Sequence, residues 1–276
     1  MKKLLSLACF FLFLNACTEI GPEITPITPT EPVDTQTVVR KVLIEELTGV
    51  RCVNCPAGTS EILRLQESYG DRLIAVALHA GSFAIPYSDS QEKFQIPETA
   101  SLLNYLGSPL GYPSAVINRK LFPDERDLQL SRGLWPVFIE QEVNSTAALE
   151  IILNSAYDND TREIRVDVQL SPIVPINQEN LKLSVMVVED LVADVQLTPD
   201  GKKADYLHRH NLRDMLTAFN GNPVETPFLP GTSQSRNYFY SLNPDWESSN
   251  CYIIAFVHLD GEEKEILQVE QLKITG

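Results

Sequence analysis

The sequence predicts an α/β domain followed by an all-β domain of the β-sandwich type, and three observations lead to this fold class. Residues 38–80 have the pattern of an apolar strand, a helix and a second apolar strand, which favours a parallel β–α–β unit. After residue 146 the chain is a series of strand patterns separated by turn clusters, which favours antiparallel sheets packed face to face. A chain of 276 residues is long enough for two such domains.

The N-terminus is predicted to be a lipoprotein signal peptide over 1–16. Two lysines precede an apolar run over 4–14, which is far shorter than the roughly 20 residues that a spanning helix needs. The sequence Leu-Asn-Ala-Cys at 14–17 resembles a bacterial lipoprotein signal, and this resemblance implies cleavage before Cys17 and lipidation of its thiol. A plain secretory signal is the alternative. In either case residues 17–36, rich in proline and threonine, are expected to be an extended tether.

The α/β domain is expected over 37–145. Its strand patterns lie at 38–47, 72–80 and 111–120, and its helical patterns lie at 60–70, 98–107 and 131–144. Gly70 suits the end of the first helix, and Pro136 is expected to break the first part of the last one.

The all-β domain is expected over 146–276. Its segments carry alternating or continuous apolar residues, and turn clusters such as YDNDT and TPDGKK separate them. One segment differs, because residues 205–219 place His208, Leu212 and Met215 on one helical stripe. The sequence therefore predicts a helix there.

The charge and the motifs exclude several classes of function. The net charge of −15 and the isoelectric point near 4.7 disfavour binding to nucleic acid or to an anionic membrane surface. The sequence has no Ser-His-acid pattern, Gly-rich phosphate loop or nucleotide fingerprint, so hydrolase and kinase functions have no support. No cofactor is predicted.

The five cysteines can be sorted by their place in the chain. Cys9 leaves with the signal and Cys17 carries the lipid, so three thiols remain in an oxidising compartment. The simplest pairing joins Cys52 to Cys55 and leaves Cys251 single. Cys251 is then either a small buried residue of a strand or a resolving thiol for Cys52.

Cys52 and Cys55 lie between a buried strand and a helix, which favours redox chemistry. A helix N-terminus presents free N–H groups and a partial positive charge, and both lower the pKa of a thiol. Arg51 adds a positive charge beside Cys52. A four-residue loop gains little chain entropy from closure, so the pair is a poor structural crosslink. A structural disulfide and a metal site remain as alternatives.

A metal site at this pair would need two further ligands. The candidates are His79, His208, His210, His258 and Cys251. In the expected helix His208 and His210 point apart, so they do not form the closely spaced second pair of a structural zinc site, and no metal ligand is assigned. His208 is interpreted as a hydrogen-bonded core histidine. His210 and Arg213 are interpreted as a surface patch, either functional or simply solvated.

Residues 38–120 resemble the thioredoxin fold. The resemblance rests on Cys-Val-Asn-Cys between strand and helix, on the strand RLIAVALHA after that helix, and on Gly-Tyr-Pro-Ser before the next strand. It implies a cis-proline at Pro113 that faces the cysteines and shapes a docking groove. The chain departs from the family pattern at Arg51, where thioredoxins have an aromatic residue.

The same resemblance implies a buried acid that helps to deprotonate the second cysteine. Glu46 falls at that position, six residues before Cys52. Glu45 is the neighbouring alternative, because a sequence alone does not fix the registry of a strand.

The chain as a whole resembles the outer-membrane-protein-28-related lipoproteins of Gram-negative bacteria. The matching stretches are EELTGVRCVNCPAG, GYPSAVINR, DYLHRHNLRDML and AFVHLDGEEKEILQVEQLKI. The resemblance implies a lipid-anchored outer-membrane protein, facing either the periplasm or the exterior, with a thioredoxin-like domain and a C-terminal β-rich domain.

Two hypotheses for function follow. In the first, the protein performs thiol–disulfide exchange on exported proteins: Cys52 attacks, Cys55 resolves the mixed disulfide, Pro113 shapes the docking groove and Glu46 assists proton transfer. In the second, it is a non-enzymatic binding or adhesion module of the outer membrane, with a structural Cys52–Cys55 disulfide. Both predict exported envelope proteins as partners and attachment to the membrane through the lipid on Cys17.

Overall fold

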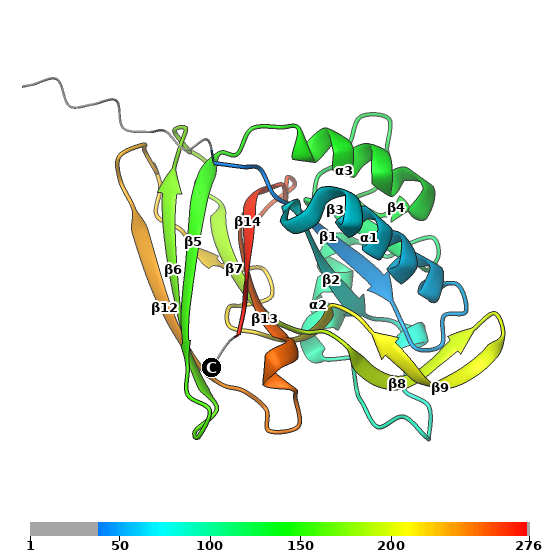
Figure 1. The fold of residues 1–276 in the computed structure, drawn as a ribbon. Coiled ribbons are helices and arrows are strands. Elements are labelled where there is room, and N and C mark those ends of the chain that lie inside the picture. Colours follow the sequence, from blue (N-terminus) through cyan, green and yellow to red (C-terminus); the bar gives the residue numbers. More distant parts are fainter. Residues whose placement is uncertain (1–37, 275–276) are drawn as a thin grey trace, which may run out of the picture. The chain divides into compact units, whose positions relative to one another are not determined.

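The computed structural model describes residues 38–274, which are mostly β-structure with few helices (Figure 1). The helices are α1 (Cys55–Tyr69), α2 (Pro97–Leu106) and α3 (Trp135–Val143). The first strands are β1 (Val42–Thr48), β2 (Leu73–His79), β3 (Ser114–Ile117) and β4 (Leu130–Ser131). The later strands are β5 (Leu149–Tyr157), β6 (Glu163–Pro172), β7 (Leu181–Glu189), β8 (Val192–Thr198), β9 (Gly201–His208), β10 (Asn211–Met215), β11 (Asn222–Pro223), β12 (Gln234–Ser241), β13 (Cys251–Leu259) and β14 (Ile266–Lys273).

The signal peptide, the lipidation at Cys17 and the tether lie outside the described residues. Within 38–274 no helix combines the length and the apolar character needed to cross a membrane.

One mixed sheet of nine strands contains strands from both expected domains. Its order is β14-β13-β7-β10-β2-β1-β3-β4, with β11 paired to β7. β1 and β2 are parallel, and β3 is antiparallel to β1. β10 joins the two parts, because Asn211 pairs with Ala77 of β2 while the other edge of β10 pairs with β7. The sheet therefore crosses the expected boundary at residue 145.

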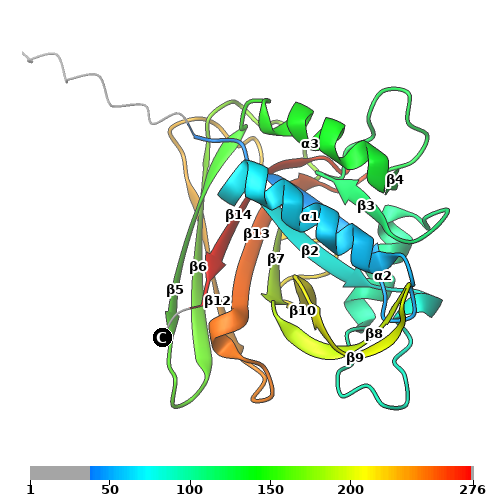
Figure 2. The ribbon, with the colours of Figure 1, turned by 45° about the vertical axis from the view of Figure 1, so that its right-hand side comes forward.

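Helices cover both faces of the part of this sheet formed by β1, β2 and β3. Figure 2 shows α1 lying across β1 and β2 on the same side as α3. The opposite face packs against α2 through Leu102 and Leu106. β1 and β2 are buried along their whole length, which explains why β2 is a nearly continuous apolar run. β1 differs, because Glu45, Glu46 and Thr48 are buried polar residues within it.

A second, three-stranded antiparallel sheet has the order β12-β6-β5. It packs against β7 and β13 of the large sheet through one apolar core. Along β6 every second residue is buried, and the residues between them are more exposed; the buried ones are Ile164, Val166, Val168, Leu170 and Pro172. This alternation is the period of a strand with one covered face.

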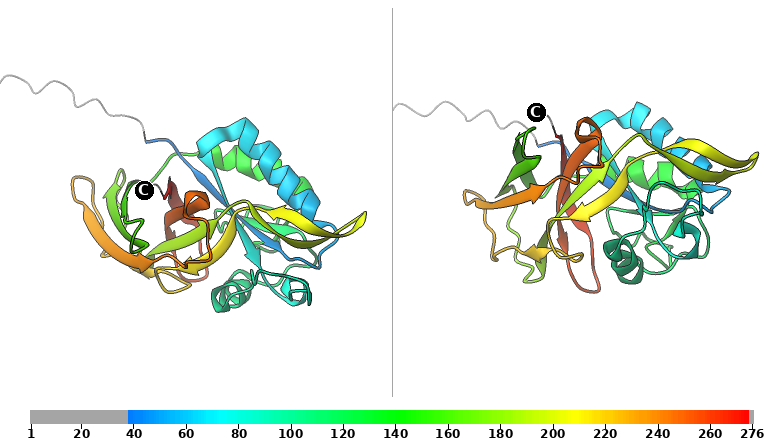
Figure 3. Two further views of the ribbon diagram at one scale, coloured as in Figure 1. Left: turned by 60° about the horizontal axis from the view of Figure 1, so that its bottom comes forward. Right: turned by 90° about the horizontal axis from the view of Figure 1, so that it is seen from below.

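β8 and β9 form a two-stranded hairpin outside both of these sheets. In Figure 3 this hairpin, drawn in yellow, extends beside the end of the blue strand β1. Leu191 before it and His210 after it both have left-handed backbones, with φ angles of 61° and 54°.

The helix predicted for 205–219 is wrong, since this segment forms the end of β9 and all of β10. The reason is a long-range contact: β10 fits between β2 and β7, and the amide of Ala77 donates a 2.7 Å hydrogen bond to the carbonyl of His210. Sheet pairing with distant strands has overridden the local helical spacing.

The remaining helices follow the sequence, with shifted starts. α1 begins at Cys55, earlier than its apolar pattern, and carries Pro56 in its first turn, where a missing N–H costs no hydrogen bond. α3 carries Pro136 in the same position. Pro136 therefore starts the helix rather than interrupting it.

Candidate functional site

The candidate site is built around a Cys52–Cys55 disulfide, as the sequence predicted, with Cα atoms 5.4 Å apart. Cys52 lies in the turn after β1, and Cys55 is the first residue of α1. Each residue is only 2% exposed. The crosslink is thus held at a helix N-terminus, but it lies beneath other parts of the chain.

The face of the sheet that α1 covers is apolar at the start of β1 and becomes polar toward the end of β1, near the disulfide. Val42 and Ile44 of β1 pack against the apolar side of α1. Because side chains alternate along a strand, Glu46 and Thr48 continue this face, and His79 of β2 lies opposite Thr48. Polar groups therefore gather at the end of β1 that leads to the cysteines.

The Glu46 carboxyl lies between α1 and Pro113. A β-carbon placed on Gly58 would overlap the Glu46 carboxylate and would lie 2.9 Å from the Pro113 β-carbon. Glu46 is 2% exposed, and its Oε1 has no hydrogen-bond partner among the described residues. Burial raises the pKa of this carboxyl to about 8.

Glu45 lies on the opposite face of β1 and has a different environment. Its carboxylate accepts two hydrogen bonds from the guanidinium of Arg119, at 2.8 and 2.7 Å, and both side chains are fully buried. The structure therefore brings Glu46, and not Glu45, to the side of the cysteines.

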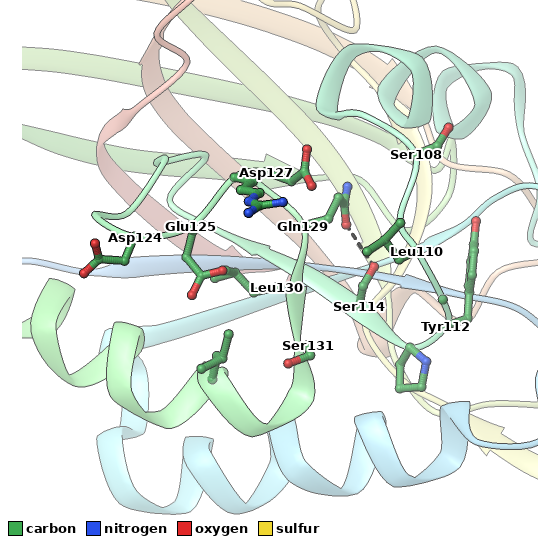
Figure 4. Close-up of a pocket in the computed structure, with 14 residues that line it drawn as sticks. Ser108, Leu110, Tyr112, Ser114, Asp124, Glu125, Asp127, Gln129, Leu130 and Ser131 are labelled. Carbon is green, nitrogen blue, oxygen red and sulfur yellow. Dashed lines mark hydrogen bonds between the residues drawn. The ribbon is translucent and has the colours of Figure 1, made fainter.

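Pro113 follows a cis peptide bond after Tyr112. A cavity of about 520 Å³ lies beside these two residues, between the loops 108–114 and 124–131. Figure 4 shows Tyr112 at one end of it and the acidic side chains Asp124, Glu125 and Asp127 at the other. Arg126 also lines this cavity, and neither Cys52 nor Cys55 does, so the cavity is distinct from the docking groove expected beside the cysteines.

The β8–β9 hairpin covers the disulfide, a contact for which the sequence carries no local signal. The amide of Leu197 donates a 2.8 Å hydrogen bond to the carbonyl of Val50. The side-chain amide of Gln196 donates to the carbonyl of Cys52 at 3.0 Å and to that of Gly49 at 3.4 Å. The loop that leads to Cys52 is therefore paired with a strand about 145 residues later in the chain.

Two buried histidines lie beside Cys55. Cys55, His79, Tyr206 and His208 line a small cavity of about 10 Å³, which is room for about one water molecule. The rings of His79 and His208 have centroids 5.5 Å apart. Burial lowers the pKa of His208 to about 4 and the pKa of His79 well below its usual value, so both rings are neutral at pH 7.

The interpretation of His208 as a buried, hydrogen-bonded histidine is confirmed, since its Nε2 contacts the carbonyl of Val195 at 3.3 Å. The patch expected from His210 and Arg213 is not present. Arg213 is 7% exposed and forms ion pairs with Glu189 at 2.7 Å and Glu92 at 3.0 Å.

The Arg51 guanidinium is held away from its expected role as a neighbour of the thiolate. It donates hydrogen bonds to the carbonyls of Ile85 at 2.6 Å and Pro86 at 2.8 Å, and it lies 4.2 Å from the ring centroid of Tyr87. Arg51 therefore fixes the loop after β2.

The other metal-ligand candidates are dispersed. His258 is buried between the Ser184 hydroxyl and the Leu259 carbonyl. Within 38–274 no three His, Cys, Asp or Glu side chains form a group that could hold a metal ion.

Cys251 is a buried free cysteine in β13, as the simpler sequence reading expected. Three strands separate β13 from β1, which corresponds to about 19 Å at the usual strand spacing. Burial raises the pKa of its thiol to about 12. Cys251 is therefore not placed to act as a resolving thiol for Cys52.

Comparison with known proteins identifies the family. Residues 101–276, more than half of the chain, match the family described as outer membrane protein Omp28. The chain belongs to the Omp28 family. The family resemblance seen in the sequence is thus confirmed, and it assigns the protein to the outer membrane. No curated protein matches the chain.

Solved structures add information on the fold. HBP35 of Porphyromonas gingivalis is similar with a TM-score of 0.66 and 18% identity, over 86% of this chain and 76% of that one. A protein of Agrobacterium tumefaciens is similar with a TM-score of 0.54 and 13% identity, over 86% and 96% of the two chains. A domain of the outer membrane lipoprotein Omp28 from Porphyromonas gingivalis matches 47% of this chain at 20% identity, with a TM-score of 0.33.

Proposed function

We propose that this Omp28-family protein is a lipid-anchored lipoprotein that performs thiol–disulfide exchange on exported proteins through Cys52 and Cys55. In this proposal residues 37–145 act as a thioredoxin-like unit, supported by the order β1, disulfide, α1, β2 and by β3 beginning directly after Pro113. Residues 146–276 act as a β-sandwich, supported by the packing of the three-stranded sheet on β7 and β13.

The observation that carries the proposal is the Glu46 carboxyl. A buried polar group without a partner costs stability, so its presence calls for a reason other than folding. Perturbed, desolvated acids gather at functional sites, and this one lies under the helix that begins with Cys55. A pKa of about 8 is close to that of an ordinary thiol, which suits proton exchange between the two groups.

The proposed reaction conserves atoms and electrons. The Cys52 thiolate attacks one sulfur of a partner disulfide, forming a mixed disulfide and releasing the other partner sulfur as a thiolate. Cys55 then gives its proton to the ionised Glu46 and attacks the Cys52 sulfur. The Cys52–Cys55 bond forms, the second partner thiolate leaves, and the partner has gained two electrons. The reverse sequence oxidises a partner dithiol.

The test is the reduction potential of the Cys52–Cys55 pair in residues 18–276, equilibrated with glutathione or dithiothreitol. We expect a value between roughly −120 and −270 mV, the range of exchangeable pairs. A value below roughly −300 mV would be that of a structural bond and would refute the proposal. Cys55→Ser is expected to accumulate a mixed disulfide with an envelope protein, and Cys52→Ser serves as the matched control without one.

One observation favours the second candidate, a non-enzymatic binding module with a structural disulfide. Both cysteines are 2% exposed beneath the β8–β9 hairpin, so a partner sulfur has no open path to Cys52 in this conformation. A potential in the structural range together with no trapped mixed disulfide would support this candidate.

A further inference from the structure

The loop that leads to Cys52 presents main-chain acceptors along one edge. The carbonyls of Gly49, Val50 and Cys52 all face β8 and accept hydrogen bonds from it. One of the donors is the main-chain N–H of Leu197, and the other is the side-chain amide of Gln196. One main-chain bond and one side-chain amide thus satisfy acceptors that an added extended segment could also satisfy, and here the donors come from the same chain.

We propose that residues 49–52 are a docking edge for an extended polypeptide segment, and that β8 occupies this edge as an internal competitor. This inference rests on the exchange reaction proposed above. A partner reaches the Cys52 sulfur only by displacing the hairpin. The partner is defined by chemistry: it is an extended chain whose main-chain N–H groups replace that of Leu197.

The hairpin is attached in a way that permits this displacement. It forms a sheet of its own with only two strands. Its anchor is a satellite cluster of Val50, Phe94 and Val192 packed with Tyr87, together with the buried Val195 and the His208 ring on Phe94, and this is smaller than the core between the two larger sheets. Segments with few buried apolar contacts open at a lower free energy than the whole fold.

Its polar anchors can be exchanged for water. The buried Asp194 carboxylate accepts hydrogen bonds from the amides of Gln91 and Glu92, each at 3.0 Å. Gln196 is also buried and polar. These polar groups become hydrated again when the hairpin lifts. Breaking their contacts therefore costs less free energy than exposing an apolar surface of the same size.

Both ends of the hairpin have the geometry of hinges. Leu191 and His210, which flank it, hold φ angles of 61° and 54°, a region that non-glycine residues seldom adopt. Such residues sit in a sparsely populated backbone state only while the surroundings hold them there. In the proposed displacement the chain turns at Leu191 and just before His210, while His210 keeps its hydrogen bond from the amide of Ala77 and β10 stays in the sheet.

The first test measures how fast dithiothreitol reduces the Cys52–Cys55 bond in the full mature protein in detergent. Electrons come from the two dithiothreitol thiols, and freed cysteines are counted by alkylation and mass. Gln196→Leu removes the side-chain hydrogen bonds to the carbonyls of Gly49 and Cys52 and is expected to speed reduction about tenfold. Leu197→Pro removes the main-chain donor and should act in the same direction. Lys203→Ala, at an exposed position of β9 directly opposite Gln196, is the matched control and should leave the rate unchanged.

Equal rates in wild type, Gln196→Leu and Lys203→Ala would overturn the proposal, because the disulfide would then be reached with the hairpin in place. Far-ultraviolet circular dichroism of each variant verifies folding, and Gln196→Leu decides the outcome if Leu197→Pro does not fold.

The second test uses a synthetic peptide with the sequence of β8, residues 192–198. When this peptide is added in excess to the Gln196→Leu variant, it should slow reduction toward the wild-type rate. A peptide of the same residues in shuffled order should not. No slowing by either peptide would overturn the docking edge. The reduction potential of the same samples is independent of these rates, so a structural potential with a hairpin-dependent rate would refute the exchange reaction alone.

Discussion

Glu45 and Glu46 are neighbours on β1 and are both buried, yet the two faces of the strand give them opposite surroundings. Glu45 forms a bidentate ion pair with Arg119, whereas Glu46 Oε1 has no hydrogen-bond partner among residues 38–274. A paired buried carboxylate belongs to the packing of the fold, while an unpaired one is maintained at a cost in stability. Burial alone therefore does not separate a structural acid from a functional one; its partners do.

The largest expected effect is the loss of stability when the Glu45–Arg119 ion pair is broken. Arg119→Met leaves the Glu45 carboxylate buried without its counter-ion and should lower the free energy of unfolding by about 3–5 kcal/mol. Urea denaturation at pH 7 measures the loss. The double variant Glu45→Met/Arg119→Met should recover most of it, because no buried charge remains. A loss no larger than that of Arg126→Met, an exposed control, would remove the distinction between the two faces.

The next largest expected effect is a pH dependence of the free energy of unfolding that comes from Glu46. Its pKa is about 8 in the folded state and about 4.5 when unfolded, so the folded state holds a proton that the unfolded state releases between these values. Wild-type stability should therefore fall as pH rises through this window, by about 1.4 kcal/mol per pH unit. Glu46→Gln has no such proton and should gain about 3 kcal/mol relative to wild type between pH 5 and pH 7. Parallel stability curves from urea titrations at the two pH values would contradict this.

A smaller effect probes the close approach of α1 to Glu46. Gly58→Ala introduces a methyl group that overlaps the Glu46 carboxylate and crowds Pro113, and it should cost about 1–3 kcal/mol. In a Glu46→Ala background the cost should shrink, because the crowding group is gone. Thermal unfolding of both pairs measures this coupling. Ser60→Ala, at an exposed position of the same helix, is the control and should be nearly neutral.

The smallest effect concerns Cys251. Because three strands separate it from β1, Cys251→Ala in a Cys55→Ser background should trap the same amount of mixed disulfide as Cys55→Ser alone. Non-reducing gel electrophoresis followed by quantification of the trapped species measures this. A higher yield would mean that Cys251 resolves the mixed disulfide when Cys55 is absent, and it would weaken the assignment of the site to the α1 face.

The sequence contained the local part of this site. Two apolar runs, a cysteine pair and a proline in a first helical turn were sufficient to predict β1, α1, β2 and the disulfide, because each is determined by residues close in the chain. The choice between Glu45 and Glu46 was not predictable. Alternation puts the two on opposite faces, but which face meets α1 depends on the registry of β1 with β2 and β3.

The long-range contacts of the site could not be predicted from the sequence, for a related reason. Residues 205–219 fit a helical stripe locally, and only the gap between β2 and β7 makes them strands. The contact of Gln196 with Cys52 joins positions 144 residues apart, and neither residue carries a local signal for it. Apolar periodicity reports a face to be buried; it does not report which distant segment will cover that face.

The position of β10 has a consequence for the order of events during export. A chain that crosses the inner membrane from its N-terminus delivers β1, α1 and β2 first, but the neighbour of β2 begins only at Asn211, about 130 residues later. Until then β2 has an unpaired edge, and its residues are apolar except His79, which is the kind of strand that aggregates or is held by chaperones. The half of the chain that carries the cysteines can therefore finish folding only after the C-terminal half arrives. β8 precedes β10 in the chain, so it is delivered before the nine-stranded sheet can close.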